Sequence, residues 1–268
     1  MKKFKLTFYN IISPAGKVPQ KGHFRLVFLS DLHNIEFGSC NESLLDSIAS
    51  LHPDGVLIGG DQIVAKPGKA LDPGLETAIR LSESYPVYYA CGNHEYRLKL
   101  YPEVYQNAYQ EFWERIEESR ITYLENEFAD TIWNGCPVRI CGFEMKREYY
   151  DRFYRGTLPV MELTEAFGQP DPKRYTILLA HHPGYQSTYF SYGADLTLSG
   201  HYHGGVVNIG LHRGLVSPDF RIFPEYCRGI YHREHRCHII SAGIGEHTIP
   251  VRIHNPRELV VVDVTSKQ

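Results

Sequence analysis

Phe24-Arg25-Leu26-Val27-Phe28-Leu29-Ser30-Asp31-Leu32-His33 is an almost continuous apolar run that ends in polar residues. Such a run is typical of a β-strand that is buried on both faces. Asp31 and His33 are two positions apart, and residues i and i+2 of an extended chain point to the same side. We therefore expect both side chains to face one site beyond the strand. The alternative is an ordinary Asp turn followed by a loop histidine.

Four later segments repeat this pattern of an apolar strand followed by polar residues. In open α/β sheets the carboxyl ends of the strands form the ligand crevice, so five such ends predict one composite site. Mixed imidazole, carboxylate and amide groups suit borderline ions such as Mn, Fe, Co, Ni or Zn. The later residues are Asp61 after 54–58, Asn93 and His94 after 86–90, His181 after 175–180, and His201 and His203 after 194–198.

The remaining pattern predicts an α/β protein with a mainly parallel core, because strands alternate with helices. A strand is expected over 4–12, and Asn134-Gly135 predicts a hairpin among short strands from 121 to 143. Helices are expected over about 41–51, 72–84, 102–119 and 186–192. The polar, aromatic segment 144–173 is also predicted to be helical, and it either covers a site or forms a solvated helix. Strands over 206–211, 229–231, 238–241 and 259–264 predict a second, largely antiparallel set.

Composition excludes several classes of protein. The 268 residues are 43% hydrophobic and 22% charged, which is ordinary for a globular chain, and the net charge is −3. Without an aromatic-basic motif, we expect no nucleic-acid partner. The basic N-terminus lacks the apolar run of a signal peptide, and no transmembrane segment is expected. Six scattered cysteines without a CxxC pair indicate reduced thiols in a cytoplasmic protein. The sequence does not predict the oligomeric state.

Taken together, the polar strand ends resemble the motifs of the calcineurin-like metallophosphoesterase superfamily, in family order. The resemblance covers roughly residues 24–264, and we expect residues 1–268 to form a single metallophosphoesterase domain. It implies a four-layer α/β/β/α sandwich of two mixed β-sheets flanked by helices. The tail, with Ser217-Pro218 and Ala242-Gly243-Ile244-Gly245 before Pro250-Val251-Arg252, looks like the bacterial branch containing the YkuE- and YaeI-type phosphoesterases. The motifs are Asp31-Leu32-His33, Gly60-Asp61, Gly92-Asn93-His94-Glu95, His181 and Gly200-His201-Tyr202-His203.

The resemblance also implies two divalent transition-metal ions (Mn, Fe, Zn, Co or Ni, with Mn favoured) and a role for each motif residue. His94 is not needed as a ligand and is expected to be the general acid. His182 follows His181 directly, which makes the choice between the two ambiguous, and we favour His181 from the motif. One ion is expected on Asp31, His33, Asp61 and His203, and the other on Asp61, Asn93, His181 and His201, with Asp61 bridging them.

The expected function is hydrolysis of a small-molecule phosphoester, most simply a phosphodiester or a pyrophosphate-linked substrate. Two cations lower the pKa of a shared water, so that a metal-bridged hydroxide attacks phosphorus while His94 protonates the leaving oxygen. The alternatives are a phosphomonoesterase and a catalytically silent metal-binding scaffold. The motifs specify phosphate chemistry only, so the choice of substrate is expected to depend on the rim at 97–120, 144–173 and 212–238. The locally basic segment 221–238 is interpreted as a solvated face rather than a substrate-binding one.

Overall fold

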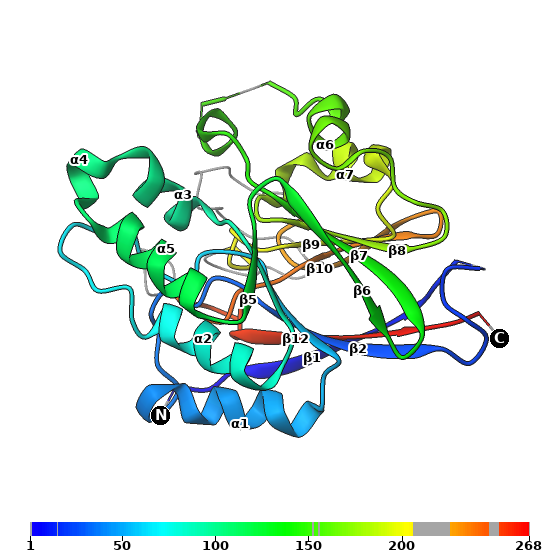
Figure 1. The fold of residues 1–268 in the computed structure, drawn as a ribbon, viewed down its shortest axis with the longest axis horizontal. Coiled ribbons are helices and arrows are strands. Elements are labelled where there is room, and N and C mark those ends of the chain that lie inside the picture. Colours follow the sequence, from blue (N-terminus) through cyan, green and yellow to red (C-terminus); the bar gives the residue numbers. More distant parts are fainter. Residues whose placement is uncertain are drawn as a thin grey trace.

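The computed structural model describes residues 2–14, 16–151, 153–154, 156–205, 226–246 and 252–267. Its core consists of two mixed six-stranded sheets that are flanked by helices, which confirms the expected α/β class (Figure 1). The expected strand over 206–211 lies outside the described residues, as do Ser217, Pro218 and the start of the basic segment at Arg221. No helix in the described ranges combines the length and the apolar character needed to cross a membrane.

The first sheet has the strand order β1-β12-β2-β3-β4-β5. All neighbours in it pair in parallel except β12 and β2, which are antiparallel. The strand expected over 259–264 therefore joins this sheet, between the first two strands of the chain, and not the second set as predicted. The strands are β1 (Lys5–Ile12), β2 (His23–Leu29), β3 (Gly55–Ile58), β4 (Val87–Ala90), β5 (Ile121–Leu124) and β12 (Glu258–Thr265).

The second sheet has the order β10-β11-β9-β8-β7-β6. Its three central pairings are parallel, and only the hairpins β6–β7 and β10–β11 are antiparallel, so the expectation of a largely antiparallel set is wrong. The Asn134-Gly135 turn joins the first hairpin as expected. The strands are β6 (Glu127–Trp133), β7 (Cys136–Phe143), β8 (Tyr175–Ala180), β9 (Leu196–Ser199), β10 (Gly229–Arg233) and β11 (Arg236–Ile240).

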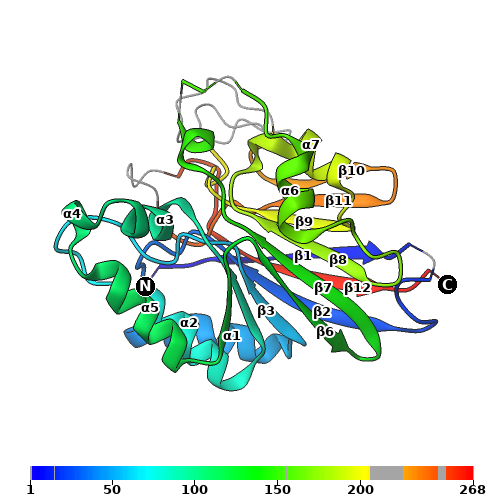
Figure 2. The ribbon, with the colours of Figure 1, turned by 45° about the horizontal axis from the view of Figure 1, so that its top comes forward.

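Apolar side chains on alternate positions explain why the strand segments read as continuous runs. In β2, Phe24, Leu26 and Phe28 lie in the core between the two sheets. Val27 and Leu29, on the other face of the same strand, lie in the core under the helices α1 (Glu42–Leu51), α2 (Gly74–Ser84) and α5 (Ala108–Glu118). Each buried side chain of this size contributes about 1.5–3 kcal/mol. On the outer face of the second sheet, a third core lies under α6 (Val160–Phe167) and α7 (Gln186–Tyr192), as Figure 2 shows.

Three helical expectations differ from the structure. The helix expected over 102–119 is divided into α4 (Pro102–Tyr105) and α5, because Gln106 between them has a φ of 54°. The helix α3 (Asn93–Leu100) is not among those expected, because its polar sequence has no apolar stripe to reveal it. Among the described residues of 144–173, only η2 (Arg147–Tyr150) and α6 are helical, with Pro159 and Gly168 flanking α6. The short helices η1 (Ser39–Asn41) and η3 (Pro183–Tyr185) precede α1 and α7.

A buried histidine links neighbouring strands of the second sheet by hydrogen bonds. The His238 Nε2 atom of β11 lies 2.8 Å from Ser199 Oγ, which in turn donates to the carbonyl oxygen of Ala180 at 2.6 Å. On the other side of the ring, the Gln186 side chain donates to His238 Nδ1 at 3.1 Å. Burial lowers the pKa of His238 to about 3. The ring is therefore neutral, with its proton on Nε2.

We predict that acid destabilises the protein partly through His238. Its pKa is near 6.5 in an unfolded chain and about 3 in the fold, so the stability is complete above pH 6.5 and is lost as the pH falls toward 3. At pH 5 this loss is about 2 kcal/mol. Urea unfolding in chelator at pH 7.5 and pH 5 measures it, with His238→Gln as the non-titrating control. Equal losses in both proteins would contradict the prediction.

Candidate metal centre

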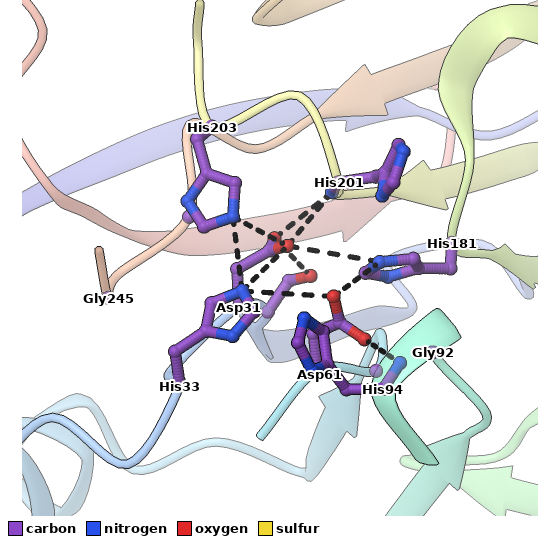
Figure 3. A network of polar contacts seen from close by, with 12 residues as sticks. Asp31, His33, Asp61, Gly92, His94, His181, His201, His203 and Gly245 are labelled. Carbon is purple, nitrogen blue, oxygen red and sulfur yellow. Dashed lines mark hydrogen bonds and ion pairs between the residues drawn. The ribbon is translucent and has the colours of Figure 1, made fainter. Parts of the chain in front are cut away.

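The predicted site residues come from loops that follow five strands of both sheets. Asp31 and His33 follow β2, Asp61 follows β3, and α3 begins with Asn93 after β4. From the second sheet, His181 follows β8, and His201 and His203 follow β9. Figure 3 shows Asp31 and Asp61 at the centre, with His33 and His203 on one side and His181 and His201 on the other. The site thus lies where the ends of the two sheets meet.

The backbone at five of these site residues is left-handed rather than extended. The φ angles are 58° at Asp31, 49° at His33, 54° at Asp61, 65° at His201 and 48° at His203. Non-glycine residues rarely adopt this conformation, and such residues cluster at functional sites. We expected residues two positions apart to face the same site because the chain would be extended there. The members of each pair, Asp31 with His33 and His201 with His203, do reach the site. The reason is wrong, however, because the backbone is left-handed.

One half of the site gathers Asp31, His33 and His203. His203 Nε2 lies 3.4 Å from Asp31 Oδ1, and His33 Nε2 lies 4.0 Å from the same oxygen. The two Nε2 atoms are 3.1 Å apart. His33 Nε2 is also 3.7 Å from Asp61 Oδ2, which brings the second carboxylate to the edge of this half. One ligand atom from each of Asp31, His33 and His203 can therefore reach a common cation.

The other half gathers Asp61, Asn93, His181 and His201. His181 Nε2 lies 3.2 Å from Asp61 Oδ2, while its Nδ1 lies 2.6 Å from the carbonyl oxygen of Gly59. A carbonyl can only accept, so the proton is on Nδ1 and the Nε2 lone pair faces Asp61 when the ring is neutral. Metal-binding histidines characteristically use their second nitrogen in this way.

The donor set of this half fits a cation. The Asn93 side-chain amide reaches His201 Nδ1 at 2.8 Å and Asp61 Oδ2 at 3.3 Å. Its nitrogen can donate to both atoms, and with a cation present its oxygen can face inward as a ligand. Amide oxygen, carboxylate and imidazole are ligands that transition metals accept together.

The pKa values of the two carboxyl groups also favour a bound cation. Burial raises the pKa of Asp31 to about 6, with the Asp61 carboxylate adding to the shift. Burial also favours neutral Asp61, but His181 and His94 reverse this effect and hold the pKa of Asp61 well below its usual range. In the same way, Asp61 overcomes burial to raise the pKa of His181 to about 10. Two buried carboxylates in one site are stable together only with added positive charge.

His94 lies at the site but differs from the other histidines. Its Nδ1 accepts a hydrogen bond from the backbone N–H of Ala65 at 2.8 Å. When the ring is neutral, its proton is therefore on Nε2, which can donate. His33, Asp61 and His94 also bring one candidate ligand atom each within 4.8 Å of one another. The ring packs edge-on against His33 with 4.8 Å between centroids, and the backbone N–H of His94 donates to Asp61 Oδ1 at 2.8 Å.

Among the described residues, the clusters of candidate metal ligands do not include His182. Its Nδ1 accepts a hydrogen bond from the Gly184 N–H at 3.0 Å, and its ring lies 4.7 Å from the His201 ring. The structure therefore brings His181 next to Asp61 and places His182 behind His201.

Glu95 supports the site, a role that the sequence did not reveal. Oε2 accepts from the N–H groups of Asp61 at 2.9 Å and Gly92 at 3.1 Å, and Oε1 accepts from Gln62 N–H at 2.9 Å and Tyr89 O–H at 2.6 Å. Burial and the Asp61 charge raise the pKa of Glu95 to about 7. The buried carboxyl thus fixes the loop that presents Asp61.

Two further features complete the surroundings. A Cβ on Gly200 would lie 2.0 Å from Ser30 Oγ and 2.2 Å from Asp31 Oδ2, so only glycine lets the β9 loop approach β2. The Arg252 guanidinium, also missed from the sequence, lies with Nη2 3.3 Å from His203 Nδ1 and donates to the Gly245 carbonyl at 2.6 Å. It places a fixed positive charge beside the first half of the site.

Comparisons with known proteins identify related phosphoesterases. The family model of calcineurin-like phosphoesterases matches residues 24–205. An uncharacterised metallophosphoesterase of Aquifex aeolicus (strain VF5) is 36% identical, over 94% of this chain and 88% of its own. The uncharacterised metallophosphoesterase YkoQ of Bacillus subtilis (strain 168) is 24% identical, over 92% and 86% respectively. A crystal structure of a Staphylococcus aureus protein assigned as a 5′-nucleotidase shares the fold with a TM-score of 0.51, at 11% identity over 92% of this chain and 55% of that one.

We predict that Glu95→Gln destabilises the protein by roughly 2–4 kcal/mol, because an amide N–H₂ would face donors that now bind a carboxylate oxygen. Urea unfolding in the presence of chelator measures the change without a contribution from metal. Tyr89→Phe is the matched control, since it removes one donor and leaves the four bonds from backbone N–H groups, and it should cost about 1 kcal/mol. Equal stability of the two variants would show that Glu95 does not organise the loop.

Proposed function

The chain belongs to the calcineurin-like phosphoesterase family, and from that premise we propose that it is a dinuclear metal-dependent phosphodiesterase. Its substrate is a small molecule with a phosphodiester or pyrophosphate link, and residues 1–268 act as one domain. The observation that carries the proposal is the convergence of carboxylate, amide and imidazole groups from Asp61, Asn93, His181 and His201, a donor set that suits a transition-metal ion. All six cysteines are free thiols, which supports a cytoplasmic location.

In this proposal each half of the site holds one divalent ion, and manganese is the ion that we favour. Asp31, His33 and His203 would hold the first, Asn93, His181 and His201 the second, and Asp61 both. When bound, such ions neutralise phosphate oxygens and lower the pKa of a coordinated water. Support for the shared role of Asp61 comes from Oδ2, which lies 3.7 Å from His33 Nε2 and 3.2 Å from His181 Nε2.

The chain's own contribution to the reaction is proton transfer and positioning. His94 Nε2 carries a proton and lies beside His33 and Asp61, so it is placed to donate to the leaving oxygen of the ester. Ala65 N–H holds the ring in this tautomer. Arg252 adds a positive charge close to the oxygens of a bound phosphate, and the Glu95 carboxyl keeps Asp61 in place.

Turnover of a substrate panel by the manganese-loaded protein tests the function. The panel contains phosphodiesters, phosphomonoesters and nucleotide-sugar pyrophosphates. The proposal expects the highest kcat/KM among diesters or pyrophosphates. A preference for monoesters would make the protein a phosphomonoesterase, and no turnover of any compound by a protein with both ions bound would identify a metal-binding scaffold.

We predict about two metal ions per chain after loading with manganese and desalting, measured by elemental analysis. His181→Ala should bind about one ion or fewer, because it loses an Nε2 ligand next to Asp61. His182→Ala is the matched neighbour and should retain about two, since the clusters of candidate ligands among the described residues do not include His182. The reverse ranking would show that the ligand is His182, and one ion or fewer in the unmodified protein would contradict the dinuclear centre.

We predict that His94→Gln keeps its metal and loses activity unevenly. A proton donor matters most when the leaving group would otherwise depart as a basic alkoxide, so kcat/KM for an alkyl or sugar diester should fall by about 10²–10⁴-fold. A nitrophenyl diester, whose leaving group is stable as an anion, should lose much less. Equal losses on both substrates would show that His94 acts by charge or position alone, and loss of metal would make it a ligand.

A further inference from the structure

The short helix η2, in the segment expected to cover a site, is held firmly beside the metal centre. The buried Tyr149 side chain donates a hydrogen bond to Glu162 of α6, and Lys146 forms an ion pair with the same carboxylate at 3.2 Å. On the opposite side, the Tyr185 hydroxyl donates to the Tyr149 carbonyl oxygen at 3.0 Å. In Figure 2, η2 is the short coil between β7 and α6. These contacts fix the position of the next residue, Tyr150.

Tyr150 faces the second half of the metal centre. Its ring centroid lies 5.4 Å from that of His201, 5.6 Å from His182 and 6.3 Å from His181. The side chain is partly exposed. Tyr150 is thus the residue of η2 that a molecule held at the His181 and His201 half would meet.

The Tyr150 hydroxyl is chemically suited to bind an anion. This hydroxyl has no hydrogen bond to a described residue, and it belongs to a partly exposed side chain that is not among the unpaired groups buried from solvent. A tyrosine hydroxyl is protonated at neutral pH, so it can donate to an acceptor or accept from water.

We propose that Tyr150 is a substrate-contacting residue of this site, whose hydroxyl donates a hydrogen bond to a phosphoryl oxygen bound at the His181 and His201 half. This inference rests on the proposed function. His94 packs against His33, on the other half of the centre. His94 and Tyr150 would therefore donate to different oxygens of one phosphoryl group. The bond strengthens as negative charge builds up on that oxygen, so Tyr150 contributes more to the transition state than to the bound phosphate.

Tyr150→Phe tests the proposal, because it removes the hydroxyl and keeps the ring. In the manganese-loaded protein, kcat/KM for a nitrophenyl diester should fall about 10- to 100-fold, mostly through kcat. The dissociation constant for inorganic phosphate, measured by calorimetry, should rise about 3- to 10-fold. Metal content and thermal midpoint should not change. Tyr231→Phe, which loses a hydroxyl of β10 directed at the backbone carbonyl of Arg228, is the control and should keep both values.

Each result decides the matter. Unchanged kcat/KM and phosphate affinity in Tyr150→Phe would overturn the proposal, and so would loss of metal, because Tyr150 would then support the ligands instead of the substrate. If the unmodified protein binds phosphate but hydrolyses no ester, the proposed function fails while the phosphate measurement still tests Tyr150. If it binds no phosphate, there is no phosphoryl group for Tyr150 to contact, and the inference fails as well.

Discussion

Two carboxylates buried in one small space are the constraint on which the site depends. Asp31 and Asp61 are almost completely inaccessible to solvent, and each alone would resist ionisation there. Five imidazoles, one guanidinium and the backbone N–H groups of His94 and His201 surround them and supply positive charge or hydrogen bonds. The left-handed loops and the glycine contacts follow from this requirement, because so many polar groups can converge only if the backbone comes close as well.

The fold was predictable where one physical signal dominated. Strands such as β2 and β8 are buried on both faces, so their apolar runs are continuous and easy to recognise. The sheet that a strand joins is a matter of tertiary packing, and nothing local in 258–265 shows that this strand lies between β1 and β2. Likewise α3 has no apolar stripe, since its residues serve the site instead of a core.

The candidate site was predictable in its members but not in its geometry. Polar residues at strand ends were visible because each follows an apolar run. The left-handed φ values were not visible, since they result from contacts between loops that are far apart in the sequence. For the same reason, the sequence did not reveal the roles of Glu95 and Arg252. Glu95 binds backbone groups 32 to 34 positions away, and Arg252 reaches His203 across 49 positions. Tyr150 has no motif around it, and only its packing against His201 shows its place.

The position of β12 also has a consequence for biosynthesis. The strand occupies the place between β1 and β2, pairing with the former in parallel from Lys5 to Ile12. During translation, β1 and β2 therefore lack β12 as a partner until more than two hundred further residues have been made. Until then both expose backbone and apolar edges that other chains could join. Closure of the sheet requires contacts of very long sequence separation, which makes folding slow and gives chaperones a period in which to act on the nascent chain.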